Sequence, residues 1–157
     1  MIEPSIGRVK VRRAALRDVD FLVRQRREMW VSMGEQNGVE HADQTYRRWI
    51  RTRLRSGTVV GWVAETDEQE IVAGGIVWLR PSMPRPGVRG LVQPFLLSMY
   101  TEPGWRGLGL GSRIIGEAVK WTKRNGYTHL RLHASFRGRS LYLQQGFKRT
   151  WEMKLKL

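Results

Sequence analysis

Residues 105–113, with the sequence WRGLGLGSR, place three alternate glycines between two arginines and lead into residues that favour a helix. Such a turn leaves unpaired backbone N–H groups at the positive end of the helix dipole, where an anion binds. Gly107, Gly109 and Gly111 would let the backbone approach a phosphate and adopt positive φ, while Arg106 adds a charge-assisted hydrogen bond. The pattern predicts a phosphate-binding loop, although glycines also collect where a helix packs tightly on a sheet.

Two well-known phosphate loops do not fit this stretch. A P-loop ends in Gly-Lys-Ser/Thr, whereas Gly111-Ser112 is followed by Arg113. A dinucleotide-binding loop follows the first strand of a βαβ unit and is followed by an acidic residue about 20 residues later. Here the glycines come late in the chain and lack that spacing.

The remaining reactive residue types suggest no second kind of site. His129 and His133 lie four residues apart with no nearby carboxylate, and His41 lies alone at the start of an expected helix. Neither arrangement has the spacing of a metal site, and the chain contains no cysteine. No Ser/His/Asp arrangement points to an acyl-enzyme. We therefore expect neither a metal nor a covalent intermediate.

The N-terminal half of the chain reads as a strand, two helices and a hairpin. Alternating apolar and basic residues predict a strand over 7–14. Apolar residues at helical spacing predict helices over 16–33 and 41–56, with Asp18 as a cap of the first and Gly57 as the end of the second. Two β-rich runs separated by Asp-Glu-Gln predict a hairpin, which covers residues 58–66 and 70–80.

The C-terminal half should carry the glycine loop between a strand and a helix. After a proline-broken loop over 81–90, the sequence predicts strands over 95–103, 127–135 and 147–157, and helices over 112–126 and 138–145. The resulting order is β-α-α-β-β-β-α-β-α-β. It predicts an α/β fold with a mixed, mostly antiparallel central sheet flanked by helices on both faces.

Length and composition limit the class of protein. A chain of 157 residues with 41% apolar residues is long enough to bury one core without staples. We find no repeat or linker and expect one domain over 1–157. The absence of cysteine excludes disulfides and suits a reducing compartment. No signal peptide and no membrane-spanning run is recognisable, so we expect a cytoplasmic protein without membrane contact.

The charge is large and uneven. The formal net charge is +14, and residues 81–157 contribute 14 basic against only 3 acidic residues. Such a field favours an anionic partner, either a phosphorylated cofactor or a nucleic acid, and disfavours polycationic substrates. Arginines that merely solvate the surface are an equally good explanation, so charge alone names no partner.

Three segments together resemble a known family. Arg106-x-x-Gly109-x-Gly111 matches the R/Q-x-x-G-x-G/A signature of the GNAT superfamily of acyl-CoA N-acyltransferases. Upstream, LLSMYTEP is similar to the family's fourth strand, and downstream LYLQQGF has its Leu-Tyr-x-x-x-Gly-Phe pattern. The close resemblance covers residues 95–152, and the predicted order of elements extends it along the chain as a single GNAT-like domain.

The resemblance implies acetyl-CoA as co-substrate. Backbone groups of Met99 and Thr101 would hydrogen-bond its pantetheine arm like an added strand. Ser135 stands where many members have an Asn that contacts the same arm, and a serine has fewer donors for that contact. Gly138 replaces a common alanine. The pyrophosphate would be held by the loop residues Arg106, Gly107, Leu108, Gly109, Leu110, Gly111 and Ser112.

The same resemblance makes Tyr142 the general acid that protonates the departing thiolate of CoA, in contact with the cofactor. A phenol with a pKa of about 10 stays protonated at neutral pH. The alternative is that Tyr142 is only a packing residue of a short helix, but the Gly146-Phe147 pattern favours the acid. The backbone N–H of Met99 would stabilise the oxyanion that forms when an amine attacks the thioester.

A base must take the proton of the attacking amine, because an alkylamine with a pKa of about 10.4 is almost fully protonated at neutral pH. The candidates are Glu28, Glu102, and Tyr100 acting through water. Glu102 is expected close to the pyrophosphate loop, and Glu28 is equally explained as a solvated helix residue. The sequence leaves this assignment open.

The acceptor and the partners also stay open. The family's acceptor pocket lies by the first two helices and the loop before the fourth strand, where bulky residues serve either as pocket walls or as core: Trp30, Met33, Trp49, Trp78 and Met83. The expected activity is N-acetylation of a primary amine. The alternative is an inactive GNAT-like basic module that binds nucleic acid or another polyanion, although no nucleic-acid motif supports it. The resemblance also allows a homodimer.

Overall fold

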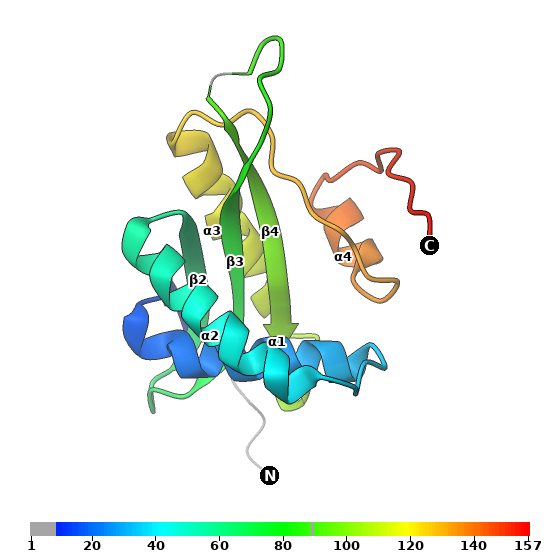
Figure 1. The fold of residues 1–157 in the computed structure, drawn as a ribbon. Coiled ribbons are helices and arrows are strands. Elements are labelled where there is room, and N and C mark those ends of the chain that lie inside the picture. The colour runs from blue at the N-terminus through cyan, green and yellow to red at the C-terminus, as the bar shows by residue number, and fades with distance from the viewer. Residues whose placement is uncertain (1–8, 89) are drawn as a thin grey trace.

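The computed structural model describes residues 9–88 and 90–157 and has one antiparallel sheet at its centre (Figure 1). The strands lie in the order in which they occur along the chain, so each one pairs with the next. This arrangement needs only short connections, apart from the segment that carries the first two helices. The strands are β1 (Val9–Arg13), β2 (Val59–Thr66), β3 (Ile71–Pro81) and β4 (Val92–Thr101).

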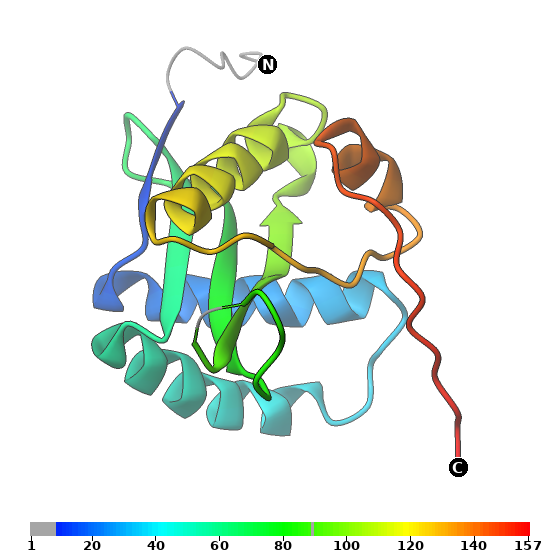
Figure 2. The same cartoon turned by 90° about the horizontal axis from the view of Figure 1, so that it is seen from above.

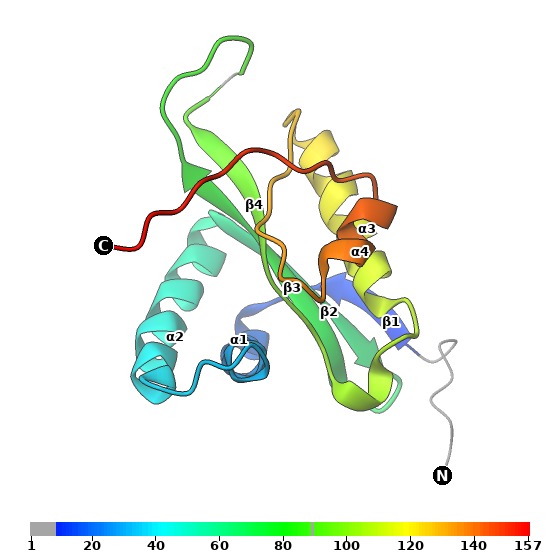
Figure 3. The ribbon, with the colours of Figure 1, turned by 90° about the vertical axis from the view of Figure 1, so that its right-hand side faces the viewer.

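Helices cover both faces of this sheet (Figures 2 and 3). The helices α1 (Val19–Ser32) and α2 (Val39–Ser56) pack together on one face, and α3 (Leu110–Arg124) packs on the other. The short helix α4 (Arg139–Gln144) lies on the α3 side, beyond the edge formed by β4. Two 3-10 turns, Leu16–Asp18 and Pro103–Trp105, precede α1 and α3. The expected fold class is therefore confirmed.

Two apolar clusters hold the layers together, one on each face of the sheet. Val60, Trp62 and Ala64 of β2 face the α3 side. Val59 and Val63, which alternate with them, face α1 and α2. Because successive side chains of a strand point to opposite faces, β2 must be apolar at nearly every position to be covered on both. This explains its continuous apolar sequence.

The predicted helices and the hairpin are confirmed with small shifts of their ends. β2 and β3 pair antiparallel across the turn at 67–70. Gly57 ends α2 with a positive φ of 74°, which a glycine adopts without strain. Helix α3 buries the predicted apolar stripe, with Ile114, Ile115 and Ala118 fully inside.

The two strands predicted over 127–135 and 147–157 are wrong. In the first segment only Arg131 forms a bridge, parallel to Phe95 of β4, and the chain then leaves the sheet edge. The second segment has no strand, and Trp151 is 94% exposed. Alternating apolar residues make a strand only where a neighbouring strand offers a free edge and a covered face. In this structure residues 147–157 lie beside no strand with which they pair.

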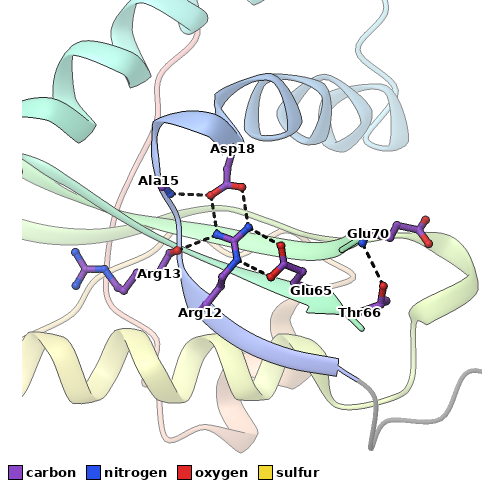
Figure 4. Close-up of polar contacts among 7 residues, drawn as sticks. All are labelled: Arg12, Arg13, Ala15, Asp18, Glu65, Thr66 and Glu70. Atoms are coloured by element: carbon purple, nitrogen blue, oxygen red, sulfur yellow. Dashed lines mark hydrogen bonds and ion pairs between the residues drawn. The ribbon is translucent and has the colours of Figure 1, made fainter. Parts of the chain in front are cut away.

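Asp18 does not cap α1 in the predicted way. Its carboxylate accepts hydrogen bonds from both Nη atoms of Arg12, at 2.8 and 2.9 Å, and from the backbone N–H of Ala15 at 2.7 Å (Figure 4). Arg12 also binds Glu65 of β2 through two N–H groups at 2.8 Å. This buried ion cluster fixes the start of α1 to β1 and β2. Helix capping by its side chain is absent because the carboxylate is already occupied.

Candidate functional site

A β-bulge interrupts β4 at its outer edge. Gly74 pairs with Tyr100 and Ile76 pairs with Leu97, so two residues of β4 lie opposite the single Gly75. Ser98, inside this bulge, has a φ of +54°, a conformation that costs energy for a residue with a side chain. No strand of the described residues lies beyond this edge of β4. The bulge therefore presents strained backbone at a free sheet edge.

The bulge divides its side chains between the two faces. The side chain of Met99 lies over Gly75 and close to Ile114 of α3. Ser98 contacts the opposite face instead, because its Oγ accepts a hydrogen bond from Arg26 of α1 at 3.3 Å. Backbone at residues 98–99 thus separates a space on the α3 side from a space on the side of α1 and α2.

Gln25 holds the bulge from behind. Its side chain is buried, and its Nε2 donates to the carbonyl oxygen of Tyr100 at 3.0 Å. A Cβ on Gly74 would lie 2.6 Å from Gln25 Oε1, so only glycine admits this side chain. The sequence analysis missed Gln25. The signal was available, since Gln25 lies on the same helical stripe as the buried Leu22.

The glycine loop follows β4 and leads into α3. Gly107 and Gly109 have positive φ values of 77° and 76°, and Gly109 is the residue before the first turn of α3. No heavy atom outside the loop lies within 4 Å of a Cβ placed on either glycine. The N–H groups of this turn and of the first helical turn are therefore available to an oxyanion such as a pyrophosphate.

The remaining loop residues have other roles. Gly111 is helical and not in the expected positive-φ conformation, and its Cβ would lie 3.2 Å from Leu141 of α4, so it serves close packing. The side chain of Leu110 is buried in the core and that of Leu108 is half-buried. Leu108, Leu110 and Ser112 can therefore contribute to an anion site mainly through backbone atoms.

Arg106 is anchored beside this loop. Its Nε donates to the carbonyl oxygen of Thr101 at 2.9 Å, and its guanidinium lies 5.6 Å from the ring centre of Tyr100. The carbonyl of Thr101 is therefore occupied in this structure, although it was expected to bind pantetheine. The exposed remainder of the guanidinium is held at the mouth of the glycine loop, where its charge favours an anion.

Tyr142 lies on α4, against the same apolar cluster as Met99. Its ring packs edge-on against Phe147, with centres 5.9 Å apart. Gly138 makes room for it, since a Cβ there would lie 3.1 Å from the ring. Burial raises the pKa of the Tyr142 phenol above its usual value of 10.0. The group therefore stays protonated at neutral pH and can act as a proton donor.

Ser135 has a structural contact at the start of α4. Its Oγ accepts a hydrogen bond from the backbone N–H of Gly138 at 3.1 Å. The hydroxyl hydrogen is free to turn toward a ligand, but one lone pair is committed to the turn. The side chain of Ser135 thus stabilises the turn that precedes α4, the helix that carries Tyr142.

The three candidate bases lie around one position. Burial raises the pKa of Tyr100, and the negative charges of Glu102 and Glu28 raise it further, against the opposing effects of Arg106 and Arg24. Glu102 forms an ion pair with Arg24. Glu28 is half-exposed, and its nearest cationic partner is Arg27 at 3.9 Å. Of the two carboxylates, Glu28 is thus the less firmly bound.

The bulky residues expected near an acceptor pocket separate into groups. Trp49 and Trp78 pack edge-to-face with ring centres 5.2 Å apart in the core beside α2. The side chains of Met33 and Met83 are exposed. Trp30 lines a cavity between α1 and α2.

Residues 9–88 and 90–157 contain no cluster of three or more His, Cys, Asp or Glu placed to hold a metal ion. Within the same residues no helix has the length and apolar character needed to cross a bilayer.

Comparisons with known proteins agree with this geometry. The sequence profile of the acetyltransferase (GNAT) domain matches residues 58–149, which include β2, the bulged strand, the glycine loop and α4. A search of curated protein sequences gives no significant match.

Several solved structures have the same fold. A GCN5-related N-acetyltransferase from Ralstonia eutropha JMP134 superposes with a TM-score of 0.87 at 24% identity, over 95% of this chain and 98% of that one. A predicted acetyltransferase with acetyl-CoA from Clostridium acetobutylicum gives 0.85 at 27% identity, over 95% of both chains. A ribosomal-protein-alanine N-acetyltransferase from Brucella melitensis biovar Abortus 2308 gives 0.69 at 20% identity, over 95% and 98%.

Proposed function

Because the chain belongs to the GNAT acetyltransferase family, we propose that it moves an acetyl group from acetyl-CoA to a primary amine by direct attack of the amine on the thioester. The observation that carries this proposal is the pairing of two features along one short segment. A strained bulge at Ser98 opens the edge of β4, and the positive-φ turn at Gly107 and Gly109 follows it at the start of α3.

Each part of acetyl-CoA has residues suited to it. The turn from Arg106 to Ser112 offers backbone N–H groups, a helix dipole and a guanidinium to the pyrophosphate. The free edge of β4 around Met99 and Thr101 offers backbone groups to the amide-containing pantetheine arm. Binding there requires the Thr101 carbonyl to be shared with, or released by, Arg106. Acetyl-CoA supplies the activated acetyl group.

The attacking amine forms the new C–N bond while the C–S bond breaks, and two protons must move. We assign Glu28 as the base that accepts the amine proton, directly or through Tyr100 and water, because Glu102 is held in an ion pair by Arg24. The backbone N–H of Met99 stabilises the negative charge that develops on the carbonyl oxygen. Tyr142 donates its phenolic proton to the sulfur that leaves, and its raised pKa keeps that proton in place until then.

The first test is thermal unfolding with and without acetyl-CoA. A ligand at 100 times its dissociation constant adds about 2.7 kcal/mol to the free energy of unfolding, which raises Tm by several degrees in a protein of this size. Arg106→Ala should reduce this rise. Arg139→Ala, an exposed arginine of α4 outside the loop, is the matched control and should retain it. Release of free thiol from acetyl-CoA in the presence of amines then reports transfer.

The opposite result has a clear meaning. If acetyl-CoA leaves Tm unchanged while a nucleic acid raises it with a steep salt dependence, the basic surface and not the glycine loop is the functional feature. The proposal of acetyl transfer would then be abandoned.

A further inference from the structure

A cavity of about 310 Å³ lies between α1 and α2. It is within the size range of small-molecule sites. Its wall includes Arg26 and Trp30 of α1 and Tyr46 of α2. Arg26 also connects the cavity to β4, because its Nη1 donates to Ser98 Oγ in the bulge. The cavity therefore lies on the side of the bulge opposite α3, and Arg26 of its wall contacts Ser98, the residue before Met99.

Arg26 differs from the other arginines on its helix. Arg24 is paired with Glu102, and Arg27 with Asp43 at 2.8 Å. Arg26 has no ion-pair partner among the described residues, and its hydrogen bond to Ser98 uses one N–H only. Its guanidinium instead lies over two rings, with its central carbon 4.6 Å from the ring centre of Tyr46 and 5.4 Å from that of Trp30. Most of its donors are positioned but unused.

Tyr46 adds a second uncommitted polar group. Its side chain is only 9% exposed, and its hydroxyl makes no hydrogen bond of normal geometry, although Ser98 lies near enough to oppose the rise that burial causes in its pKa. A buried hydroxyl without a partner costs about 1–3 kcal/mol, so such groups are normally satisfied by a ligand or water. The Arg26 guanidinium lies in cation–π contact with the Tyr46 ring, and both residues line the same wall. Together they form a site with several donors and no fixed acceptor.

The charges on the wall narrow the ligand further. Arg26 and Arg27 are balanced by Glu35 and Asp43, so the wall is formally neutral. The unpaired guanidinium of Arg26 would repel a polycation, and the carboxylates of Glu35 and Asp43 would repel a dianion. A zwitterion satisfies the wall best, with its single carboxylate on Arg26, since a guanidinium matches a planar carboxylate through paired N–H groups.

We propose that this cavity binds the amine acceptor and that Arg26 with Tyr46 recognises a carboxylate on it, so that the acceptor class is an amino carboxylic acid. The contact between Arg26 and Ser98 places the carboxylate beside the bulge, and the amine of the same small molecule then reaches the backbone of Met99. Trp30 supplies an apolar wall for the rest of the molecule. This inference rests on the acetyl transfer proposed above.

The decisive experiment compares amino acids with their carboxamides as acceptors. Both carry the same amine and side chain, and only the acid has the carboxylate. Thiol release is measured at saturating acetyl-CoA for the wild type and for Arg26→Gln, and the ratio of kcat/KM values for acid and amide is compared. Differences in amine pKa between acid and amide cancel when the ratio is compared between enzymes.

The wild type should prefer acids, and Arg26→Gln should reduce the acid-to-amide ratio about tenfold or more, as expected for loss of a charged hydrogen bond. Tyr46→Phe should raise KM for acids several-fold and leave KM for amides unchanged. The control Arg48→Gln removes an exposed arginine of α2 and should leave the ratio unchanged. An unchanged acid-to-amide ratio in Arg26→Gln, or a wild type that acetylates phosphorylated amines or polyamines in preference to amino acids, overturns the inference.

A binding measurement separates this inference from the proposed activity. Amino acids at millimolar concentration should perturb the NMR resonance of the Trp30 indole in the wild type and much less in Arg26→Gln, with or without acetyl-CoA. If acetyl-CoA binds but amino acids cause no such response, the proposed transferase activity stands and the proposed amino acid site is wrong. If amino acids cause the response but no acetyl transfer is detected, the proposed amino acid site stands and the proposed transferase activity is wrong.

Discussion

The sulfur of Met99 occupies the space in which a side chain on Gly75 would lie, so a Cβ at position 75 would overlap it far inside van der Waals contact. The two residues face each other where the β4 bulge is opposed by β3. The bulge and the glycine are therefore parts of one arrangement: the side chain of Met99 can fold back over β3 only because Gly75 has none.

Gly75→Ala should disturb the bulge. Because both the Met99 sulfur and Ile114 of α3 crowd the new methyl group, we expect a loss of about 1–3 kcal/mol in the free energy of unfolding. Acetyl transfer should fall further than stability explains, since the N–H of Met99 shifts. Gly116→Ala is the control: its Cβ meets nothing within 4 Å in α3, and it should stabilise by about 1 kcal/mol. Chemical unfolding and kcat measured on both variants test this.

Tyr142→Phe should remove the proton donor and keep the packing against Phe147. We expect kcat to fall about 10²- to 10⁴-fold, with the Tm shift caused by acetyl-CoA unchanged. In the wild type, activity requires the protonated phenol and is lost as the pH rises through its folded pKa, which burial raises above 10.0. The alkaline fall in activity should therefore be centred at a higher pH than for an exposed tyrosine. An unchanged kcat in Tyr142→Phe would show that Tyr142 is a packing residue and not the proton donor.

The cluster of Arg12, Asp18 and Glu65 should dominate stability in acid. Burial opposes ionisation of Asp18, but the hydrogen bonds from Arg12 and Ala15 outweigh it and hold the pKa of Asp18 below its usual 3.8. The stabilisation is thus complete above about pH 4 and is lost as the pH falls through the lower folded pKa. Unfolding by urea between pH 2 and 6 should show this loss. The control Asp20→Asn removes an exposed ion-pair residue and should show the same loss of stability in acid as the wild type.

Arg12→Met should be far more damaging than a surface substitution. It leaves Asp18, which is 3% exposed, as a buried carboxylate without its cation, and such losses cost about 3–5 kcal/mol. The pH dependence should become weaker or reverse in this variant, because the pKa of Asp18 is then governed by burial. A loss below about 1 kcal/mol would mean that the cluster contributes no more than an exposed ion pair.

Removal of residues 151–157 should leave Tm nearly unchanged. These residues are exposed, and the side-chain contact that they make with the rest of the described chain is between Glu152 and His133, both at the surface, at 2.5 Å, which is an ion pair when the histidine is protonated. Exposed pairs contribute about 0–1 kcal/mol. Thermal unfolding followed by circular dichroism checks this. A fall of many degrees would show that this segment pairs as a strand in solution, as its alternating sequence predicts.

Local patterns were sufficient for most elements. The hairpin of β2 and β3, the apolar stripe of α3 and the end of α2 at Gly57 all depend on neighbours close in sequence, and each was predicted. The glycine loop was likewise found before α3 because the chemistry of an anion site is written in consecutive residues. The prediction failed for Gly111, since its role depends on Leu141 of a different helix.

The sequence by itself determined the alternation and spacing that make the strands and helices, and with them the motif that identifies the family. Only the tertiary structure decided which segments pair in the sheet and which side chains contact each other. The alternating residues of 147–157 pair with no strand in the folded chain, whereas Asp18 is held by an arginine from β1 and not by its own helix. Arg26 and Tyr46 come together in the same way, because the packing of two helices places the guanidinium over the ring, with only one of its N–H groups bound to Ser98. Contacts between distant residues depend on packing, and a one-dimensional pattern does not encode which of them form.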